Sequence, residues 1–380
     1  MINEIPLVSV IVPMYNSEKF IGELLNSLLG QTLKNFEVII VDDCSTDKSC
    51  EIVKNYLPIF EGRLHLVKMK SNTGPGLPRN KGLEISRGKY VFFMDSDDAL
   101  TIGALDTMYR CAEQFQAEVL YCKKYFQSQG FAQDFIANMK LEGDPADDKI
   151  EVVTGDFRQQ IFAWMYNNFL GAVPWLKFVL RNFLVENDIK FLSIMQEDSI
   201  WTFELAALLR RCVLIPFPVY VCRYRADSLG HSALYSSNID AKSFNLKMDR
   251  IINGLKHVDD FMSQVEDFKN APELRYEVLA HITFQNLNWV LLTYPNVPPH
   301  LIYETFKAAF AEKLGDNDVL ISALFTTAIT FIKNFTILSR QMNTPPRFEL
   351  KIKLMRKIYV RKNWISRDVF KYSAGVRRAA

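Results

Sequence analysis

Residues 90–98 read Tyr-Val-Phe-Phe-Met-Asp-Ser-Asp-Asp, an apolar run that ends abruptly in three carboxylates. Such a run predicts a strand that is buried on both faces of a parallel sheet. Side chains at the carboxyl end of this strand would lie in the crevice where open α/β sheets bind ligands. Asp-x-Asp at that place suits a divalent cation that shares its oxygen ligands with a diphosphate. The alternative is a solvated turn in which Asp97 and Asp98 cap a helix from about Thr101.

Strands and helices alternate on both sides of this stretch. Strands are predicted at 7–12, 38–41, 64–69 and 119–122, and helices at 20–28, 47–56, 77–86 and 105–115, with Ser17 as a cap for the first helix. This alternation predicts an α/β fold with a parallel sheet and right-handed crossovers. Further on we expect helices at 157–169, 179–186 and 201–209, a strand at 191–194, and a strand pair at 213–221 around two prolines.

The length and the composition indicate more than one folded domain. A chain of 380 residues in which 49% are hydrophobic is expected to form about two domains. After Tyr235 the pattern predicts helices only. We therefore predict an α/β domain at 1–235, a helical domain at 236–344 and a basic amphipathic tail at 345–380.

Charge and cysteine content exclude several classes of protein. Lys and Arg number 45 against 43 Asp and Glu, so no global charge points to nucleic acid as a partner. The six cysteines show no C-x-x-C pair, which favours free thiols in a reducing cytosol. The first residues resemble no signal peptide, and the apolar stretch 319–332 is too short to cross a bilayer. We expect a cytoplasmic protein, or one attached to a membrane only at its surface.

Polar residues follow several of the predicted strands. They include Tyr15 after the first strand, Asp42 and Asp43 after the second, Arg79 after the third and Asp95 after the fourth. Because the ends of parallel strands meet at one edge, these side chains form a set suited to a nucleoside diphosphate with a divalent ion. The glycine patterns of dinucleotide-binding and P-loop proteins are absent from the sequence, so those two interpretations are disfavoured.

Several of these segments together resemble family 2 glycosyltransferases of the GT-A fold. The matching stretches are 8–16 (VSVIVPMYN), 41–47 (VDDCSTD), 72–74 with 79–82 (NTG and RNKG), 94–98 (MDSDD), 175–177 (WLK), 197–198 (ED) and the loop 225–232. Each motif is weak alone, and the order makes them jointly specific over about the first 235 residues. The resemblance implies an inverting transfer of a sugar from a nucleotide-diphosphate donor, most often a UDP-sugar, to a hydroxyl of a glycan or lipid-linked acceptor.

The resemblance also implies roles for individual residues. Tyr15 would stack on the base, Asp43 would bind its polar edge, and Arg79 would lie near the diphosphate or ribose. The full set implied to bind the nucleotide is Pro13, Tyr15, Asp43, Arg79 and Asp95.

The reaction itself falls to other residues of the family pattern. The resemblance implies that Asp97, with His231, holds Mn²⁺ or Mg²⁺, and that Asp198, with Glu197 beside it, is the general base. One displacement inverts the stereochemistry, so a single base suffices. Residues implied to lie near the acceptor or the diphosphate are Trp175, Lys177, Arg225 and Ser232.

The sequence departs from the family pattern at two positions. Pro78 replaces a small residue and could tilt the helix that presents Arg79. Cys44 replaces a glycine, which is tolerable if the φ angle there is negative. Simpler interpretations also stand beside the functional ones: Asp42 and Asp43 could cap a helix from Asp47, and Glu197 and Asp198 could only complement a helix dipole.

The basic tail has two interpretations, and two other functions are possible for the chain. The segment 345–380 interleaves basic and apolar residues, which suits either a solvated helix or an interfacial helix on anionic lipid. One rival is a sugar-nucleotide-binding subunit of a polysaccharide assembly complex that does not turn over. A second is a nucleotidyltransferase, which would release pyrophosphate. The sequence favours an enzyme of cell-surface polysaccharide synthesis by analogy.

Overall fold

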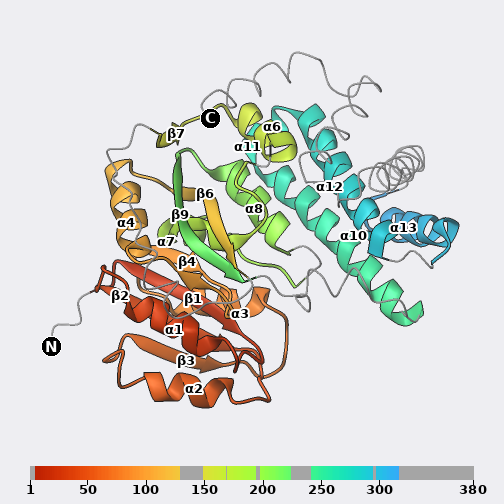
Figure 1. Cartoon of the computed structure of the whole chain (residues 1–380). Helices are drawn as coiled ribbons and strands as arrows, with labels where there is room; N and C mark the ends of the chain where they lie inside the picture. The colour runs from red at the N-terminus through yellow and green to blue at the C-terminus, as the bar shows by residue number, and fades with distance from the viewer. Residues whose placement is uncertain are drawn as a thin grey trace, which may run out of the picture. The chain divides into compact units, whose positions relative to one another are not determined.

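The computed structural model describes residues 5–128, 149–167, 169–193, 197–223, 241–293 and 297–315 (Figure 1). These residues form two compact units. The first contains the described residues up to 156 together with 170–193 and 197–223, and the second contains 157–167, 169 and those from 241 onward. The predicted domain boundaries at 235 and 344 fall outside the described residues.

The first unit contains a sheet of nine strands with helices around it. In chain order its strands and helices are β1 (Val8–Met14), α1 (Ile21–Leu29), β2 (Phe36–Asp42), α2 (Ser49–Tyr56), β3 (Leu64–Lys68), α3 (Gly76–Ile85), β4 (Tyr90–Phe93), β5 (Ala99–Leu100), α4 (Ala104–Gln114), β6 (Val119–Ser128), β7 (Glu151–Val153), a 3₁₀ turn (Pro174–Leu176), β8 (Lys177–Leu180), α7 (Arg181–Glu186), α8 (Glu197–Leu208) and β9 (Cys212–Arg223). The strand order is β3-β2-β1-β4-β8-β6-β9-β5, with β7 beside β9.

The half of the sheet that comes first in the chain is parallel, as the alternating pattern predicts. β1 pairs with β2 and β4, and β2 pairs with β3, in parallel register. Successive side chains of a strand face opposite sides, and helices cover both sides. Leu24 of α1 joins Val10 in the core cluster, whereas Gly82 of α3 lies against Ile11. This burial on both faces explains why the strands are continuously apolar.

Pro13 lies inside β1 rather than at its end. β4 pairs with β1 only as far as Ile11, so the β4 side of β1 is open beyond that residue. A proline, which has no N–H to donate, is tolerated where no partner strand needs one. The predicted strand at 7–12 therefore ends two residues too early, and β1 ends at Met14.

The second half of the sheet differs from the prediction. Residues 177–180, predicted to run into a helix, form β8, which is antiparallel to both β4 and β6. The predicted strand pair at 213–221 is a single strand, β9, whose parallel pairing with β6 contains register shifts. Residues 191–193 are not a strand. The fold is α/β with a mixed sheet.

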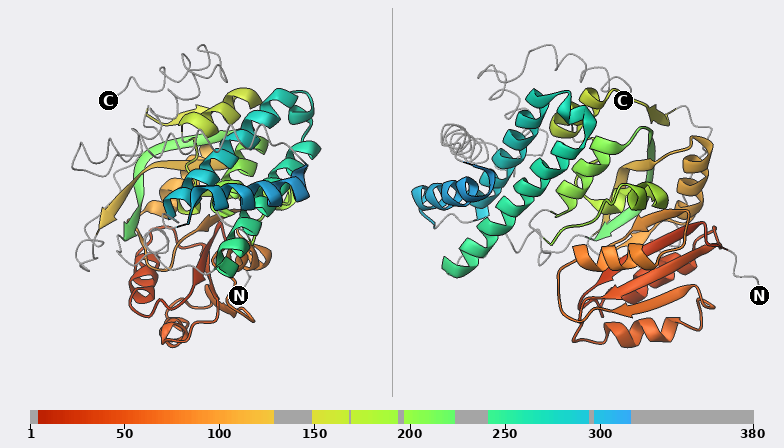
Figure 2. Two further views of the ribbon diagram at one scale, coloured as in Figure 1. Left: turned by 90° about the vertical axis from the view of Figure 1, so that its right-hand side faces the viewer. Right: turned by 180° about the vertical axis from the view of Figure 1, so that it is seen from behind.

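The second unit is helical in its described residues. It comprises α6 (Phe157–Asn167), α10 (Ala241–Gln264), α11 (Glu266–Lys269), α12 (Pro272–Thr293) and α13 (Pro299–Leu314). The helices α10, α12 and α13, drawn teal to blue in Figure 2, pack against one another. Phe157 of α6 contacts Phe268 of α11 edge to face, with ring centroids 4.8 Å apart. None of the helices in the described ranges is long and apolar enough for a membrane span.

Candidate functional site

Hydrogen bonds join the loops that follow β1, β2 and β4. The Asn16 side-chain oxygen accepts from the Thr46 N–H at 2.8 Å, which ties the β1 loop to the β2 loop. The Ser17 and Ser96 hydroxyls are 2.6 Å apart, which ties the β1 loop to the β4 loop. Ser17 is therefore not the cap of α1, which begins at Ile21. The carboxyl ends of these strands converge as the sequence predicts.

Tyr15 and Pro13 occupy this edge in different ways. Tyr15 follows β1 directly and its side chain is 50% exposed, so its ring is open to a ligand. Pro13 is buried within the strand. The predicted stacking of Tyr15 on a base is compatible with its position, and it stays a prediction.

Asp43 is buried at the end of β2 and binds the loop before α3. Its carboxylate accepts hydrogen bonds from the N–H groups of Thr73 and Gly74, at 2.9 and 2.8 Å. The Thr73 hydroxyl donates to it as well, at 3.0 Å. Asp43 thus fixes the loop that leads to Arg79, and its predicted contact with the base stays a prediction.

The capping interpretation of Asp42 and Asp43 is wrong. Asp42 accepts from the Ser45 N–H at 3.1 Å and so closes the turn after β2. At the start of α2, it is Asp47 whose carboxylate accepts from the Ser49 N–H at 3.0 Å. The two acids at the end of β2 therefore fix the turn after β2 and the loop before α3, and Asp47 accepts the N–H at the start of α2.

Arg79 joins two acidic segments that lie far apart in the chain. Its Nη2 donates to Asp95 Oδ1 at 2.9 Å, and its Nη1 lies 3.6 Å from Glu197 Oε1. The guanidinium also lies over the Phe191 ring, 5.2 Å from its centroid, and the Arg79 side chain is only 6% exposed. A buried guanidinium between two carboxylates offers donors in a fixed geometry. Pro78, in the first turn of α3, leaves the helix regular through Ile85.

The first turn of α8 contains two carboxyl groups with raised pKa values. Burial raises the pKa of Glu197 to about 7, with a further contribution from the Asp198 charge, and Arg79 opposes the rise. Burial also raises the pKa of Asp198, while Arg79 and Lys177 act in the opposite direction. A carboxylate with a raised pKa in a crevice is suited to accept a proton near neutral pH.

Lys177 and Trp175 are both buried. The Lys177 ammonium donates to the carbonyl oxygens of Gly171 and Val173 at 2.7 and 2.8 Å. Burial lowers the pKa of Lys177 to about 7, and the charge of Asp198 opposes that shift. Trp175 stacks on Tyr220 with ring centroids 4.5 Å apart. Their predicted contacts with acceptor or diphosphate stay predictions.

Asp98 is not a helix cap, so the alternative interpretation of Asp97 and Asp98 as caps of one helix is wrong. A short strand, β5, follows at Ala99, and α4 begins only at Ala104, after Gly103. The Asp98 carboxylate instead accepts from the Tyr220 hydroxyl at 2.7 Å and from the Arg223 N–H at 2.7 Å. The sequence did not predict Tyr220 and Arg223 as residues of the site, because neither belongs to a recognisable motif.

The residues at the end of β4 include carboxylates, which are suitable ligands for a divalent cation. Asp95 and Asp97 offer carboxylate oxygens, which Mn²⁺ and Mg²⁺ accept as ligands. Within the described ranges, no three His, Cys, Asp or Glu side chains converge on one metal position. An ion held here would therefore need oxygens from a bound diphosphate. The predicted partner His231 lies outside the described residues, as do Arg225 and Ser232.

Cys44 has a left-handed backbone, with φ of +66°. Cysteine replaces glycine easily only where φ is negative, and that condition is not met here. Cys44→Gly is expected to be more stable than Cys44→Ala by about 1 kcal/mol, because both lose the thiol and only alanine keeps the strained Cβ. Urea unfolding of the two variants measures this difference. Equal stabilities would show that the loop relieves the strain.

The comparisons with known proteins agree with this geometry. The model of the family "Glycosyl transferase family 2" matches residues 9–178. The chain is 32% identical over 227 residues to the uncharacterized glycosyltransferase EpsJ of Bacillus subtilis, covering 59% of this chain and 63% of that protein. It is 28% identical over 257 residues to the poly(ribitol-phosphate) β-glucosyltransferase of Bacillus spizizenii, covering 66% and 37%. The chain thus spans less than two thirds of these relatives.

One solved structure resembles the chain over most of its length. The crystal structure of Staphylococcus aureus TarS 1–349 in complex with UDP-GlcNAc has a TM-score of 0.57 and 22% identity, covering 94% of this chain and 92% of that one. This likeness supports the fold. Taken with the converging strand ends, it shows that the chain has the GT-A fold, and residues 9–178 within that fold match the family 2 glycosyltransferases.

Proposed function

We propose that this protein is an inverting glycosyltransferase. It moves a sugar from a nucleoside-diphosphate donor, UDP-linked in the first instance, to a hydroxyl of a glycan or lipid-linked acceptor in cell-surface polysaccharide synthesis. The observation that supports this most strongly is the bridge from Asp95 through Arg79 to Glu197. It brings the nucleotide end of the sheet and the acidic start of α8 into one site.

The named activities of relatives support the donor and acceptor classes. TarS of Staphylococcus aureus, 43% identical over 118 residues, is named a poly(ribitol-phosphate) β-N-acetylglucosaminyltransferase, and those residues cover 30% of this chain and 20% of that protein. The solved TarS structure has UDP-GlcNAc bound. The name of TarS thus gives poly(ribitol-phosphate) as the polymer acted on, and its solved structure gives UDP-GlcNAc as the bound ligand. A UDP-sugar donor and a cell-wall polymer acceptor are therefore the first candidates here.

The residues of this chain divide the reaction between them. Asp198 takes the proton of the acceptor hydroxyl while that oxygen bonds to the anomeric carbon. The bond from the anomeric carbon to the diphosphate breaks on the opposite face, so one displacement inverts the centre and releases the nucleoside diphosphate. Arg79 orients Asp95 and Glu197 at the two ends of the site.

A divalent ion completes the proposal. Asp97 would hold Mn²⁺ or Mg²⁺, with Asp95 beside it and the diphosphate oxygens supplying further ligands. Such an ion neutralises charge that develops on the leaving diphosphate. We also propose that residues 345–380 attach the protein peripherally to the cytoplasmic face of a membrane; their eleven Lys and Arg against two Asp and Glu support this from sequence.

The test combines binding and turnover. Calorimetry with UDP, GDP, dTDP and CMP, with and without Mn²⁺, should show metal-dependent binding of one diphosphate, and Asp97→Asn should lose it. A donor sugar on that nucleotide should then release nucleoside diphosphate when an acceptor is added. Release of pyrophosphate would favour a nucleotidyltransferase, and binding without any release would favour the non-catalytic subunit.

A further inference from the structure

Two side chains near the end of β9 hold the loop that follows β4. The Tyr220 hydroxyl accepts from the Asp95 N–H at 3.1 Å and donates to Asp98 Oδ2 at 2.7 Å. Three residues on, the Arg223 N–H donates to Asp98 Oδ1 at 2.7 Å, and its Nε donates to the Asp97 carbonyl oxygen at 3.0 Å. Residues 95, 97 and 98 of the loop are therefore each bonded to β9.

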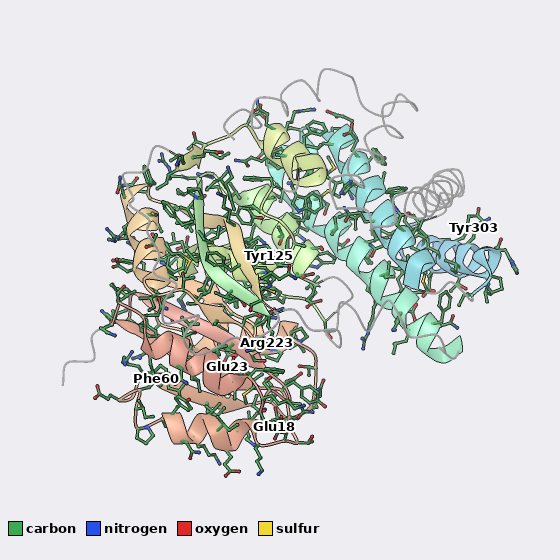
Figure 3. The ribbon with its side chains drawn as sticks, in the orientation of Figure 1. Glu18, Glu23, Phe60, Tyr125, Arg223 and Tyr303 are labelled. Atoms are coloured by element: carbon green, nitrogen blue, oxygen red, sulfur yellow. The ribbon has the colours of Figure 1, made fainter. Side chains whose placement is uncertain are left out.

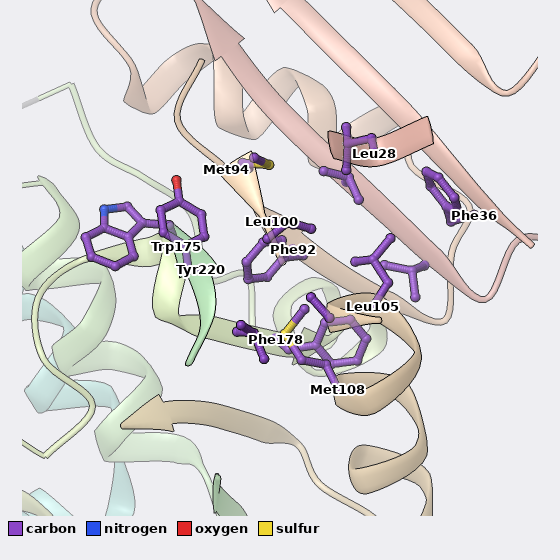
Figure 4. Close-up of a cluster of buried hydrophobic side chains, with 14 of the residues drawn as sticks. Leu28, Phe36, Phe92, Met94, Leu100, Leu105, Met108, Trp175, Phe178 and Tyr220 are labelled. Carbon is purple, nitrogen blue, oxygen red and sulfur yellow. The ribbon is translucent and has the colours of Figure 1, made fainter. Parts of the chain in front are cut away.

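Both side chains are themselves fixed. Tyr220 is fully buried, stacks on Trp175 at 4.5 Å and meets Phe92 edge to face at 6.2 Å (Figure 4). The Arg223 guanidinium pairs with Glu23 of α1, beside it in Figure 3, and lies over the Phe20 ring at 4.8 Å. Because neither side chain can rotate away without losing these contacts, the loop is held in one conformation.

The bonds end on the part of the chain that bears the proposed ligands. Asp98 uses both carboxylate oxygens on β9, so it serves as the anchor of the loop. Asp95 donates to the Tyr220 hydroxyl through its backbone N–H, and Asp97 accepts from Arg223 Nε through its backbone carbonyl oxygen. A loop held by its backbone and by Asp98 keeps Asp95 and Asp97 at fixed positions after β4, where Asp95 also accepts from Arg79.

We propose that Tyr220 and Arg223 are positioning residues that fix the carboxylates of Asp95 and Asp97 for the divalent ion and the diphosphate. This inference rests on the proposed function. Groups that orient metal ligands commonly account for about 10- to 100-fold in metal affinity. An isosteric change at Tyr220 should therefore lower the affinity for the metal ion and leave the binding of nucleotide without metal almost unchanged.

Tyr220→Phe is the sharpest test, because it removes one hydroxyl and keeps the ring. Its matched control is Tyr90→Phe, which removes a 2.7 Å bond from another tyrosine hydroxyl to a carboxylate, that of Glu113, at the opposite end of β4. Calorimetry with the diphosphate that the panel identifies gives the apparent Mn²⁺ affinity and the affinity without metal. Tyr220→Phe should bind Mn²⁺ about tenfold or more weakly, and Tyr90→Phe should bind it as the wild type does.

A second variant keeps the test decisive if Tyr220→Phe folds poorly. Arg223→Lys retains the charge opposite Glu23 and loses the Nε bond to the loop. Its control is Arg87→Lys, since Arg87 bonds to Glu37 through Nε and Nη2 at 3.1 and 3.0 Å in another part of the unit. Arg223→Lys should lower the affinity for Mn²⁺ and leave the affinity for the metal-free nucleotide unchanged. Arg87→Lys should change neither.

The outcomes separate the two proposals. Wild-type protein that binds no diphosphate in a metal-dependent way would overturn the metal site and this inference together. Wild-type binding that is metal-dependent, with equal Mn²⁺ affinity in Tyr220→Phe and Tyr90→Phe, would overturn the positioning role and leave the proposed function standing. An equal loss of metal-bound and metal-free nucleotide affinity would also overturn it, because that pattern indicates general damage to the site.

Discussion

Replacing Asp198 with asparagine is expected to lower sugar transfer by about 10²- to 10⁴-fold while nucleotide binding persists. Asparagine keeps the size and the polarity of the side chain and cannot take the proton of the acceptor hydroxyl. Because the bond from the Ser199 N–H ends on Asp198 Oδ1 at 2.9 Å, the amide oxygen can still accept it. The start of α8 should therefore keep its geometry.

Steady-state release of nucleoside diphosphate measures this loss, and calorimetry measures the binding that should remain. Asp188→Asn is the matched control, because the Asp188 side chain is 80% exposed and pairs with Lys190. Turnover of Asp198→Asn at the wild-type rate would rule out Asp198 as the base and direct attention to Glu197. Loss of both binding and turnover would point to misfolding, which a melting curve would show.

The pH dependence of the wild type follows from the same group. A general base works when it is ionised, so kcat/KM falls as pH falls through its pKa. Burial raises the pKa of Asp198 above its ordinary value of 3.8. The acidic limb of the profile should therefore lie at a higher pH than an exposed aspartate would give, and Asp198→Asn should remove that limb.

The parallel half of the sheet was predictable because its signals are local. Each of the first four strands is a short apolar run followed by a polar loop and a helix, and 90–98 shows the pattern most clearly. The strand β8 (Lys177–Leu180) was missed because only three of its four residues are apolar and α7 follows it directly at Arg181. A buried strand and a buried helix turn look alike over four residues. Pairing with β4 and β6, far away in the chain, decides between them.

Some residues of the candidate site could be predicted from local sequence, and others could not. Asp43, Asp95 and Asp198 follow strands or open a helix, so their positions could be inferred from the sequence. Tyr220 could not, because its contact with Asp98 joins residues that are 122 apart in the chain. The capping interpretations of Asp43 and Asp98 failed for a related reason, because residues far away in the chain donate to their carboxylate oxygens.

Replacing Arg79 with methionine is expected to destabilise the fold and the site together. The guanidinium neutralises Asp95 and Glu197, and removing one partner of a buried ion pair leaves uncompensated charge. A fully buried pair would cost about 3–5 kcal/mol. About 2 kcal/mol is expected here, because the Asp95 side chain is 35% exposed and water screens part of its charge.

The loss of folding stability in Arg79→Met should depend on pH. It should be larger at high pH, because it comes from ionised carboxyl groups. Arg79 holds down the pKa of Glu197 and Asp198 against burial. Without it, both pKa values rise further above those of the unfolded chain, so the folded state pays for ionised acids at high pH and not at low pH. The part of the destabilisation that comes from Glu197 should be small well below pH 7, where that group is protonated in the fold, and should grow through pH 7, the region of its pKa.

Urea unfolding at several pH values measures this effect, with Arg181→Met as the control. The Arg181 Nε donates to the neutral Ser86 hydroxyl at 3.0 Å, so its loss should depend much less on pH. Glu197→Gln added to Arg79→Met should restore part of the stability at pH 8, because it removes one of the unpaired charges. A destabilisation of Arg79→Met that is the same at every pH would show that Arg79 acts through packing on Phe191, and the electrostatic bridge between the two acidic segments would have to be abandoned.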